Sequence, residues 1–172
     1  MSRSADGLRR HCTAQLRIAS PLGALLLART EVGLTGAWFD GQKHHPGELT
    51  APVRPNDPLL CRAVDQLRRY FAGEANCFDL PLDLQGTPFQ RAVWRALLDI
   101  NTGTTQSYSA IARRVGSASA VRAVGGAIGR NPVSVIVPCH RVIGSDGSMT
   151  GYAGGIDRKL ALQTLERAAL TA

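Results

Sequence analysis

The chain has 172 residues, of which 44% are hydrophobic and 19% are charged, a balance typical of a globular protein. No apolar run approaches the roughly 20 residues that a membrane-spanning helix needs. The first seven residues have no apolar stretch behind their arginine, so we expect no secretory signal and a cytoplasmic location. The composition therefore excludes a protein that spans the membrane with apolar helices.

Positive charge is concentrated in the second half of the chain. Residues 1–86 contain ten Lys and Arg against nine Asp and Glu, a net charge of +1. Residues 87–172 contain ten Lys and Arg against four Asp and Glu, a net charge of +6. Solvated surface charge is one explanation of this asymmetry. The other is a polyanionic partner, with DNA or RNA first.

The four cysteines, Cys12, Cys61, Cys77 and Cys139, show no CxxC or CxxH spacing. In a cytoplasmic chain we expect free thiols rather than a disulfide framework. A zinc site that uses Cys12 and the His44-His45 pair is an alternative that the spacing supports only weakly.

The first half has the pattern of a small mixed α/β unit. Apolar segments at 15–18, 24–28 and 33–39 predict three strands, the first two joined by the tight turn Ser20-Pro21-Leu22-Gly23. A helix follows the start signal Asn56-Asp57-Pro58, and it has an apolar face. That face consists of Leu60, Val64, Leu67 and Phe71.

An extended segment with alternating apolar residues then runs from Phe78 towards Gly86, where we place the boundary between two domains, 1–86 and 87–172. A second helix starts at Thr87-Pro88. Two short helical patterns, beginning at Tyr108 and Val121 and separated by Val115-Gly116-Ser117, have the outline of a helix-turn-helix.

The second of these short helices carries Gly125 and Gly126 in its interior, where each costs about 1 kcal/mol relative to alanine. Small residues there allow a close approach of another backbone, either that of a packed helix or that of DNA. Asn131-Pro132 ends this helix. The apolar run 133–137 follows and predicts a buried strand.

The pentapeptide Pro138-Cys139-His140-Arg141-Val142 is the most informative feature of the sequence. Cysteine is nucleophilic as the thiolate, which a neighbouring base or cation favours, and here a histidine and an arginine follow directly. A small core cysteine at the end of a strand is the alternative. In an extended segment the thiol and the imidazole point to opposite sides, so we expect no direct contact between them.

After the turn at 144–147 comes a glycine-rich loop, Gly151-Tyr152-Ala153-Gly154-Gly155, and then a last helix. Three glycines in five residues indicate either backbone N–H groups exposed to a ligand or simple turn formation.

Together these motifs resemble the O6-alkylguanine-DNA alkyltransferases, the methylated-DNA–protein-cysteine methyltransferases. The resemblance covers about residues 16–167 and keeps the order and spacing of the family. Besides the pentapeptide and the glycine-rich loop, the matching motifs are Ser20-Pro21-Leu22-Gly23, Thr87-Pro88-Phe89, Val93-Trp94, Ser107-Tyr108, Arg122-Ala123-Val124-Gly125-Gly126, Asn131-Pro132, Arg158-Lys159 and Glu166.

The resemblance implies a fold with a ribonuclease H-like α/β N-terminal domain and a mostly helical C-terminal domain with a winged helix-turn-helix-like motif. It also implies single-turnover DNA repair. Cys139 would take the alkyl group from O6 of guanine, and from O4 of thymine as well, and keep it as a thioether. A water would bridge the thiol to His140, and Glu166 would orient the imidazole.

The resemblance assigns further roles around the flipped base. Tyr108 would protonate guanine N3, the N–H of Ala153 would contact O6, and the carbonyls of Cys139 and Val142 would hold the exocyclic amine. The remaining matched positions are Tyr152 as a wall of the pocket, Asn131 as the residue that fixes the turn, and Lys159 among the binding residues.

Base flipping follows from the chemistry, because a buried thiol cannot reach O6 inside a duplex. The resemblance makes Arg122 the side chain that fills the gap in the stack, on a helix whose Gly125 and Gly126 fit closely into the minor groove.

We therefore expect double-stranded alkylated DNA as the partner, with single-stranded DNA as a further one, and no membrane. We expect a monomer in solution that associates with the bacterial nucleoid when bound to DNA, with cooperative assembly on DNA left open. We expect no cofactor, and no metal, because the zinc ligands of some relatives have no convincing counterparts. Gln163 departs from the family, which has a leucine at that position.

Three rival functions remain beside the alkyltransferase. One is a non-catalytic alkyltransferase-like protein that binds lesions, but such proteins lack the cysteine that Cys139 provides. Another is a helix-turn-helix regulator, which would leave the cysteine, histidine and glutamate without a purpose. A cysteine hydrolase is the third, and no specific motif for an acyl-enzyme site is present.

Overall fold

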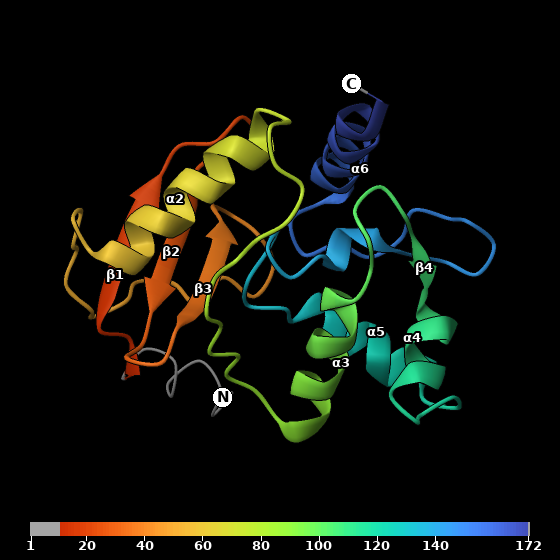
Figure 1. Cartoon of the computed structure of the whole chain (residues 1–172). Coiled ribbons are helices and arrows are strands. Elements are labelled where there is room, and N and C mark those ends of the chain that lie inside the picture. Colours follow the sequence, from red (N-terminus) through yellow and green to blue (C-terminus); the bar gives the residue numbers. More distant parts are fainter. Residues whose placement is uncertain (1–10, 172) are drawn as a thin grey trace.

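The computed structural model describes residues 11–171, in which a small sheet with one helix packs beside a mostly helical part (Figure 1). One continuous hydrophobic core runs through both parts. It joins Leu27 of the sheet to Trp94 and Leu162 of the helical part.

The sheet is antiparallel, with the order β1-β2-β3. Its strands, Ala14–Ile18, Leu25–Arg29 and Leu34–Phe39, confirm the three predicted strands. Side chains alternate across the central strand as strand geometry requires. Leu25 and Leu27 enter the main core, whereas Leu26 and Ala28 join a second cluster with Trp38 on the other face.

Helix α2, Pro58–Phe71, covers the main-core face of the sheet (Figure 1). Its start is the predicted one: the Asp57 carboxylate accepts hydrogen bonds from the N–H groups of Leu59 and Leu60 at 3.1 and 3.0 Å. Among its buried residues is Tyr70, near the end of the helix. Tyr70 therefore lies where α2 meets the helical part of the molecule.

The helical part begins with α3, Pro88–Leu98, whose start is closed by a reciprocal capping box between Thr87 and Gln90. Helices α4, Tyr108–Arg114, and α5, Val121–Gly129, pack on α3 and confirm the predicted pair of short helices. The turn between them contains Gly116 at φ +71°, a conformation that glycine adopts without strain.

The apolar run 133–137 does not form the predicted strand, apart from one bridge between Val133 and Ala37. The chain instead turns, with a hydrogen bond from the Val137 N–H to the Val133 carbonyl at 2.9 Å and Val135 at φ +72°. The run is wholly buried. Hydrophobicity predicted the burial correctly, but it does not distinguish a buried strand from a buried turn.

The backbone at the pentapeptide also differs from the extended conformation that we expected. Cys139–Arg141 form one turn of 3-10 helix, η1, and the chain becomes extended only at β5, Val142–Ile143. Strand β5 pairs in parallel with the short β4, Gln106–Ser107. The alternation of a strand therefore does not set the directions of the cysteine and histidine side chains.

The last helix, α6, spans Ile156–Thr171 and packs against η1. It stands at the top of the helical part (Figure 1), and its buried residues are Lys159, Leu162, Gln163 and Glu166. Within residues 11–171, no helix is both long enough and apolar enough to cross a membrane.

Candidate active site

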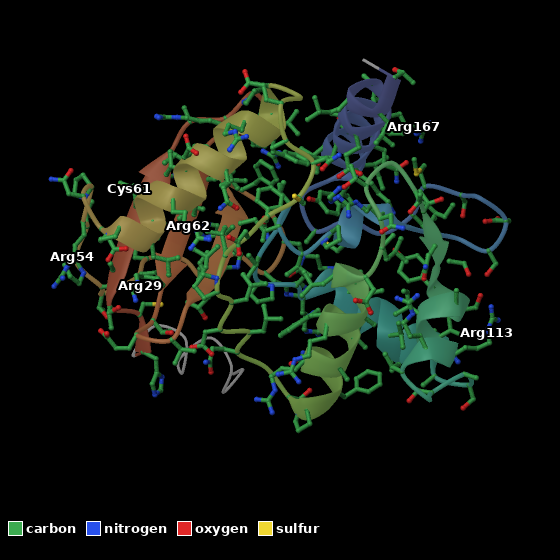
Figure 2. All side chains as sticks on the ribbon, viewed as in Figure 1. Arg29, Arg54, Cys61, Arg62, Arg113 and Arg167 are labelled. Atoms are coloured by element: carbon green, nitrogen blue, oxygen red, sulfur yellow. The ribbon has the colours of Figure 1, made fainter. Side chains whose placement is uncertain are left out.

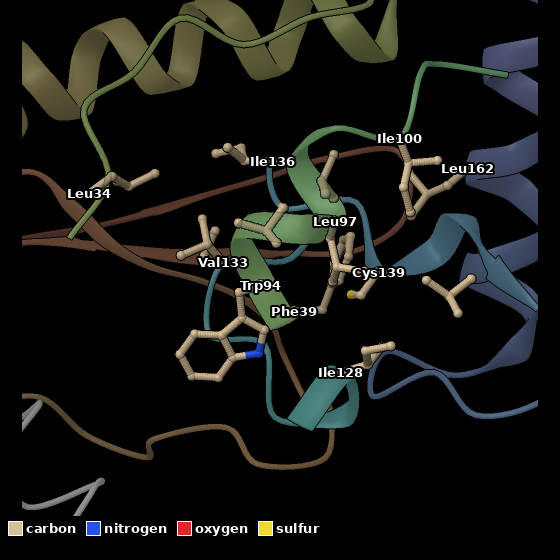
Figure 3. Close-up of a cluster of buried hydrophobic side chains, with 14 of the residues drawn as sticks. Leu34, Phe39, Trp94, Leu97, Ile100, Ile128, Val133, Ile136, Cys139 and Leu162 are labelled. Carbon is tan, nitrogen blue, oxygen red and sulfur yellow. The ribbon is translucent and has the colours of Figure 1, made fainter. Parts of the chain in front are cut away.

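Cys139 lies inside the main core, with 3% of its surface exposed. Figure 3 shows its sulfur among the buried side chains of Leu97, Ile100 and Ile128. The one polar side chain that the described residues place on it is Asn131, whose Nδ2 donates to Sγ at 3.0 Å. The thiol is thus held in an apolar setting by a single oriented amide.

Asn131 also fixes the turn that carries the cysteine. Its Nδ2 donates to the Val137 carbonyl at 2.9 Å, and its Oδ1 accepts the N–H of Val133 at 2.9 Å. The same carboxamide therefore sets both the backbone of the turn and the position of the Cys139 sulfur.

Burial raises the pKa of Cys139 to about 11, although the Asn131 hydrogen bond and the charge of Lys159 act in the opposite direction. Lys159 itself is fully buried, and its Nζ donates to the Thr150 carbonyl at 2.7 Å. A resting thiol in this setting is protonated at neutral pH, so a nucleophilic role requires a base.

His140 provides a base with a defined orientation. Its Nε2 lies 2.6 Å from Oε1 of Glu166, and both side chains are buried. A carboxylate can only accept, so Nε2 carries the proton and Nδ1 has the free lone pair. Nδ1 is buried and has no hydrogen-bond partner among the described residues, while burial lowers the pKa of the ring.

Glu166 is the centre of a buried cluster. Arg141 donates to both of its oxygens, from Nε at 3.0 Å to Oε2 and from Nη2 at 2.9 Å to Oε1. The N–H of Gly103 donates to Oε2 at 3.2 Å, and the Tyr70 hydroxyl donates to Oε1 at 2.7 Å. Burial disfavours the charge, but the bonds from His140 and Arg141 outweigh it and hold the pKa of Glu166 well below its usual range.

Arg141 and Tyr70 were not among the site residues that the sequence suggested. The sequence indicates Arg141 only as a cation next to the cysteine. In the structure its side chain also donates to the Ile100 carbonyl at 2.5 Å and to Thr102 Oγ1 at 3.1 Å. Tyr70 is 96 residues from Glu166 in the chain. No local pattern links two positions so far apart, and only the tertiary fold brings the end of α2 to Glu166.

Tyr108 lies at the start of α4, where its hydroxyl donates to the carbonyls of Thr150 and Gly151 at 3.0 and 3.1 Å. Burial, and then the proximity of Cys139, raise the pKa of this hydroxyl. Gly151 has φ +59°, and a Cβ there would lie 3.1 Å from the Tyr108 oxygen. The helical pair and the glycine-rich loop therefore meet at Tyr108.

The glycine-rich loop is held from both parts of the molecule. The Lys43 N–H donates to the Ala153 carbonyl at 2.9 Å, and Arg158 Nη1 donates to the Gly154 carbonyl at 2.9 Å. A Cβ on Gly154 would lie 2.6 Å from the ring of Tyr152, so this glycine is needed for the ring to pack. On the other side of the cysteine, the Val142 N–H donates to the Cys139 carbonyl.

Helix α5 presents a basic and small-residue surface. Arg122 is exposed on the first turn and belongs to none of the ion pairs among residues 11–171. A Cβ on Gly125 or Gly126 would meet its neighbours at 3.8 and 3.5 Å, which are ordinary contacts. Packing inside the protein therefore does not require either glycine. Arg113 projects outward from the neighbouring α4 (Figure 2).

Cys12 and Cys61 lie apart from this site, whereas the exposed Cys77 lines a pocket together with Pro138 and Arg141. Cys61 is exposed on α2 (Figure 2), and Cys12 belongs to the second hydrophobic cluster. In the part of the chain that the structure describes, no group of three or more His, Cys, Asp or Glu side chains is placed to hold a metal ion.

Comparison with known proteins identifies the family. Residues 17–84 match the ribonuclease-like domain of 6-O-methylguanine DNA methyltransferase, and residues 88–168 match its DNA binding domain. The methylated-DNA–protein-cysteine methyltransferase of Mycobacterium tuberculosis (strain H37Rv) is 50% identical over 150 residues, 87% of this chain and 90% of that protein. The corresponding protein of Methanosarcina barkeri is 47% identical, over 87% of this chain and 94% of its own length.

The crystal structure of Mycobacterium tuberculosis OGT in complex with DNA has a similar fold, with a TM-score of 0.84 and 48% identity over 91% of this chain and 94% of that one. A ribonuclease-like domain followed by a DNA-binding domain is the fold class that the sequence predicted. This chain belongs to the 6-O-methylguanine DNA methyltransferase family.

Gln163, the position at which the resemblance led us to expect leucine, has a clear structural role here. It is buried, and its Nε2 donates to the carbonyl of His140 at 2.7 Å. Its Oε1 accepts a hydrogen bond from the exposed Arg167 at 3.1 Å. The amide thus connects α6 to the turn that carries the cysteine and histidine.

Replacement of Gln163 by leucine should destabilise the protein. The change leaves the buried carbonyl of His140 without its donor, which costs about 1–3 kcal/mol in the free energy of unfolding. Urea unfolding would measure the loss. Arg167→Ala is the matched control, because it removes only the exposed partner of the same amide and should change stability by about 0.5 kcal/mol or less. Equal stability of Gln163→Leu and the natural protein would contradict this role.

Proposed function

We propose that this chain repairs DNA by moving the alkyl group of O6-alkylguanine irreversibly onto its own Cys139. The observation that carries the proposal is a buried thiol followed in the chain by an imidazole whose Nε2 is bonded to Glu166 and whose Nδ1 has no partner among residues 11–171. Membership of the methyltransferase family, and the DNA that a 48% identical relative binds in its crystal structure, support the same reaction.

The transfer is a displacement at the alkyl carbon. The Cys139 proton passes through one water to His140 Nδ1, and a sulfur lone pair forms the new S–C bond. The bond from that carbon to O6 breaks, and its electron pair stays on the guanine. Glu166 stabilises the imidazolium that forms, because it accepts the proton-bearing Nε2 at 2.6 Å. A thiol whose pKa is raised to about 11 gains most from such a base.

The departing guanine needs a proton, for which Tyr108 is the proposed donor at N3. Its hydroxyl bonds to the carbonyls of Thr150 and Gly151, so it is held at the start of the glycine-rich loop. The proton on His140 returns to Tyr108 through solvent after transfer, and the net products are an S-alkylcysteine and guanine. The Ala153 N–H at O6, the Cys139 and Val142 carbonyls at the exocyclic amine, and the Tyr152 ring would complete the pocket.

Because Cys139 is 3% exposed, the damaged nucleotide has to leave the duplex to reach it. Arg122 is proposed to occupy the vacated place in the base stack. Its exposure on α5, together with nearby Gly126 four residues further on the same helix face, supports a close approach to the minor groove.

Several finer assignments belong to the same proposal. O4-alkylthymine is a second substrate, and single-stranded as well as double-stranded DNA is bound. The protein acts as a cytoplasmic monomer that joins the nucleoid on DNA. Residues 1–86 form a structural domain and residues 87–172 the catalytic and DNA-binding domain. Lys159 supports the site through its buried charge near Cys139.

Intact-protein mass spectrometry after incubation with an O6-methylguanine oligonucleotide tests the proposal directly. We expect a gain of one methylene unit, localised to Cys139 by peptide mapping. Cys139→Ala should show no gain and still bind the oligonucleotide. An unchanged mass of the natural protein would instead favour a lesion-binding protein or a helix-turn-helix regulator.

Arg122→Ala should separate base flipping from alkyl transfer. Loss of the side chain that fills the stack should slow repair of a methylated duplex by at least about tenfold, as expected for a few kcal/mol of unstacking. Reaction with free O6-benzylguanine, which needs no flipping, should change little. Rate measurements on both substrates check this, and equal losses on both would contradict the role of Arg122.

Gly126→Ala should separate DNA binding from folding. Its Cβ has room inside the protein at 3.5 Å from Arg130, and alanine favours the helix by about 1 kcal/mol. We therefore expect equal or higher stability in urea, together with weaker binding to duplex DNA by fluorescence anisotropy. Unchanged DNA affinity would show that no DNA backbone approaches α5 at this position.

A further inference from the structure

Tyr70 is the one side chain of the sheet-bearing part that the described residues place on Glu166. It comes from α2, has 2% of its surface exposed, and donates its hydroxyl to Oε1 at 2.7 Å. Its ring is held by Phe71 and Phe78, at centroid distances of 5.5 and 5.3 Å. The hydroxyl is therefore fixed by aromatic packing before it contributes to the site.

The oxygen that Tyr70 contacts is the one that His140 uses. Oε1 accepts from Tyr70 at 2.7 Å and from His140 Nε2 at 2.6 Å. Arg141 is the third residue that donates to it, from Nη2 at 2.9 Å and from Nε at 3.2 Å. Donors on one carboxylate oxygen compete, because each draws electron density from the same lone pairs. A strong hydrogen bond from Tyr70 therefore weakens the pull of Glu166 on the Nε2 proton.

We propose, on the basis of the alkyl-transfer function above, that Tyr70 is a positioning residue that fixes the Glu166 carboxylate and limits how strongly it stabilises a protonated His140. The consequence is an imidazole that stays neutral, and hence available as a base, to lower pH than Glu166 would otherwise allow. The sheet-bearing part thus contributes to the chemistry and not only to the fold.

The charges around His140 allow its titration to be recognised. From α6 it faces Glu166 and Lys159, from its own turn Cys139 and Arg141, and Tyr70 reaches Glu166 from α2. Glu166 has a pKa far below its usual range, and burial followed by the Glu166 charge raises that of Tyr70 far above its own. Burial raises the pKa of Cys139 to about 11, and the positive charges of Arg141 and Lys159 act on His140 as well. Burial lowers the pKa of His140, and this imidazole is the group whose change of charge the proposal invokes.

The test is the pH dependence of the single-turnover rate at saturating methylated duplex, where differences in DNA affinity cancel. The rate falls as pH decreases through the pKa of His140, because the protonated ring cannot accept the thiol proton. In Tyr70→Phe the carboxylate loses a competing donor and holds the imidazolium more strongly. The acid limb of the pH–rate profile is the range in which the rate falls as the pH decreases. We expect this limb to move to higher pH by about half a unit or more, as loss of one hydrogen bond to a charged group would produce.

Ser134→Ala is the matched control. The Ser134 hydroxyl also links the two parts of the molecule, because it donates to Gln42 Oε1 at 3.1 Å, and it takes part in none of the hydrogen bonds around Glu166. This variant should keep the acid limb of the natural protein. A limb that moves equally in both variants would assign the effect to loss of packing between the parts and would overturn the proposal.

A second substitution changes the hydroxyl without removing it. With 3-fluorotyrosine at position 70 the hydroxyl is a stronger donor, so the acid limb should move to lower pH, opposite to Tyr70→Phe. If the acid limb has the same position in Tyr70→Phe, in the 3-fluorotyrosine protein and in the natural protein, the role of Tyr70 is overturned and the transfer function is unaffected. Absence of methyl transfer by the natural protein would overturn both.

Discussion

The buried carboxylate of Glu166 is the constraint on which the rest of the site depends. An anion taken out of water is stable only when donors replace the lost hydration. Here His140, Arg141, Tyr70 and the Gly103 N–H supply them at 2.6 to 3.2 Å. Each donor is held in place by the charge that it stabilises. Removal of any one of them leaves an under-solvated charge, so the cluster acts as a unit.

This cluster also determines how the parts of the molecule fit together. Arg141 bonds to the Ile100 carbonyl just after α3, Gly103 lies in the same loop, and Tyr70 comes from α2. The orientation of the imidazole thus depends on three separate segments as well as on α6. An alkyltransferase reacts once, so the site has to be assembled correctly before the substrate arrives, and rigid packing serves that purpose.

The turn from Asn131 to Arg141 shows where pattern-based reasoning fails. Its apolar run was expected to be a strand, and its cysteine and histidine were expected to alternate along extended backbone. The structure has a buried turn and a 3-10 helix instead, held by the side chain of Asn131. An uninterrupted apolar sequence encodes burial, whereas the backbone conformation depends on which polar group satisfies the buried N–H and carbonyl groups.

The sequence by itself determined the three strands of the sheet and the main helices, and it pointed to Cys139 and His140 as the proposed reactive pair. Strand and helix boundaries followed from periodicity and from capping residues such as Asp57 and Thr87, which act over one helical turn. The family motifs around Cys139 identified the chemistry. Only the tertiary structure decided which donors surround Glu166, because Tyr70 and Gln163 act across contacts that no local pattern encodes. Local signals are read from neighbouring residues, but a buried charge is satisfied by whichever segments the fold brings to it.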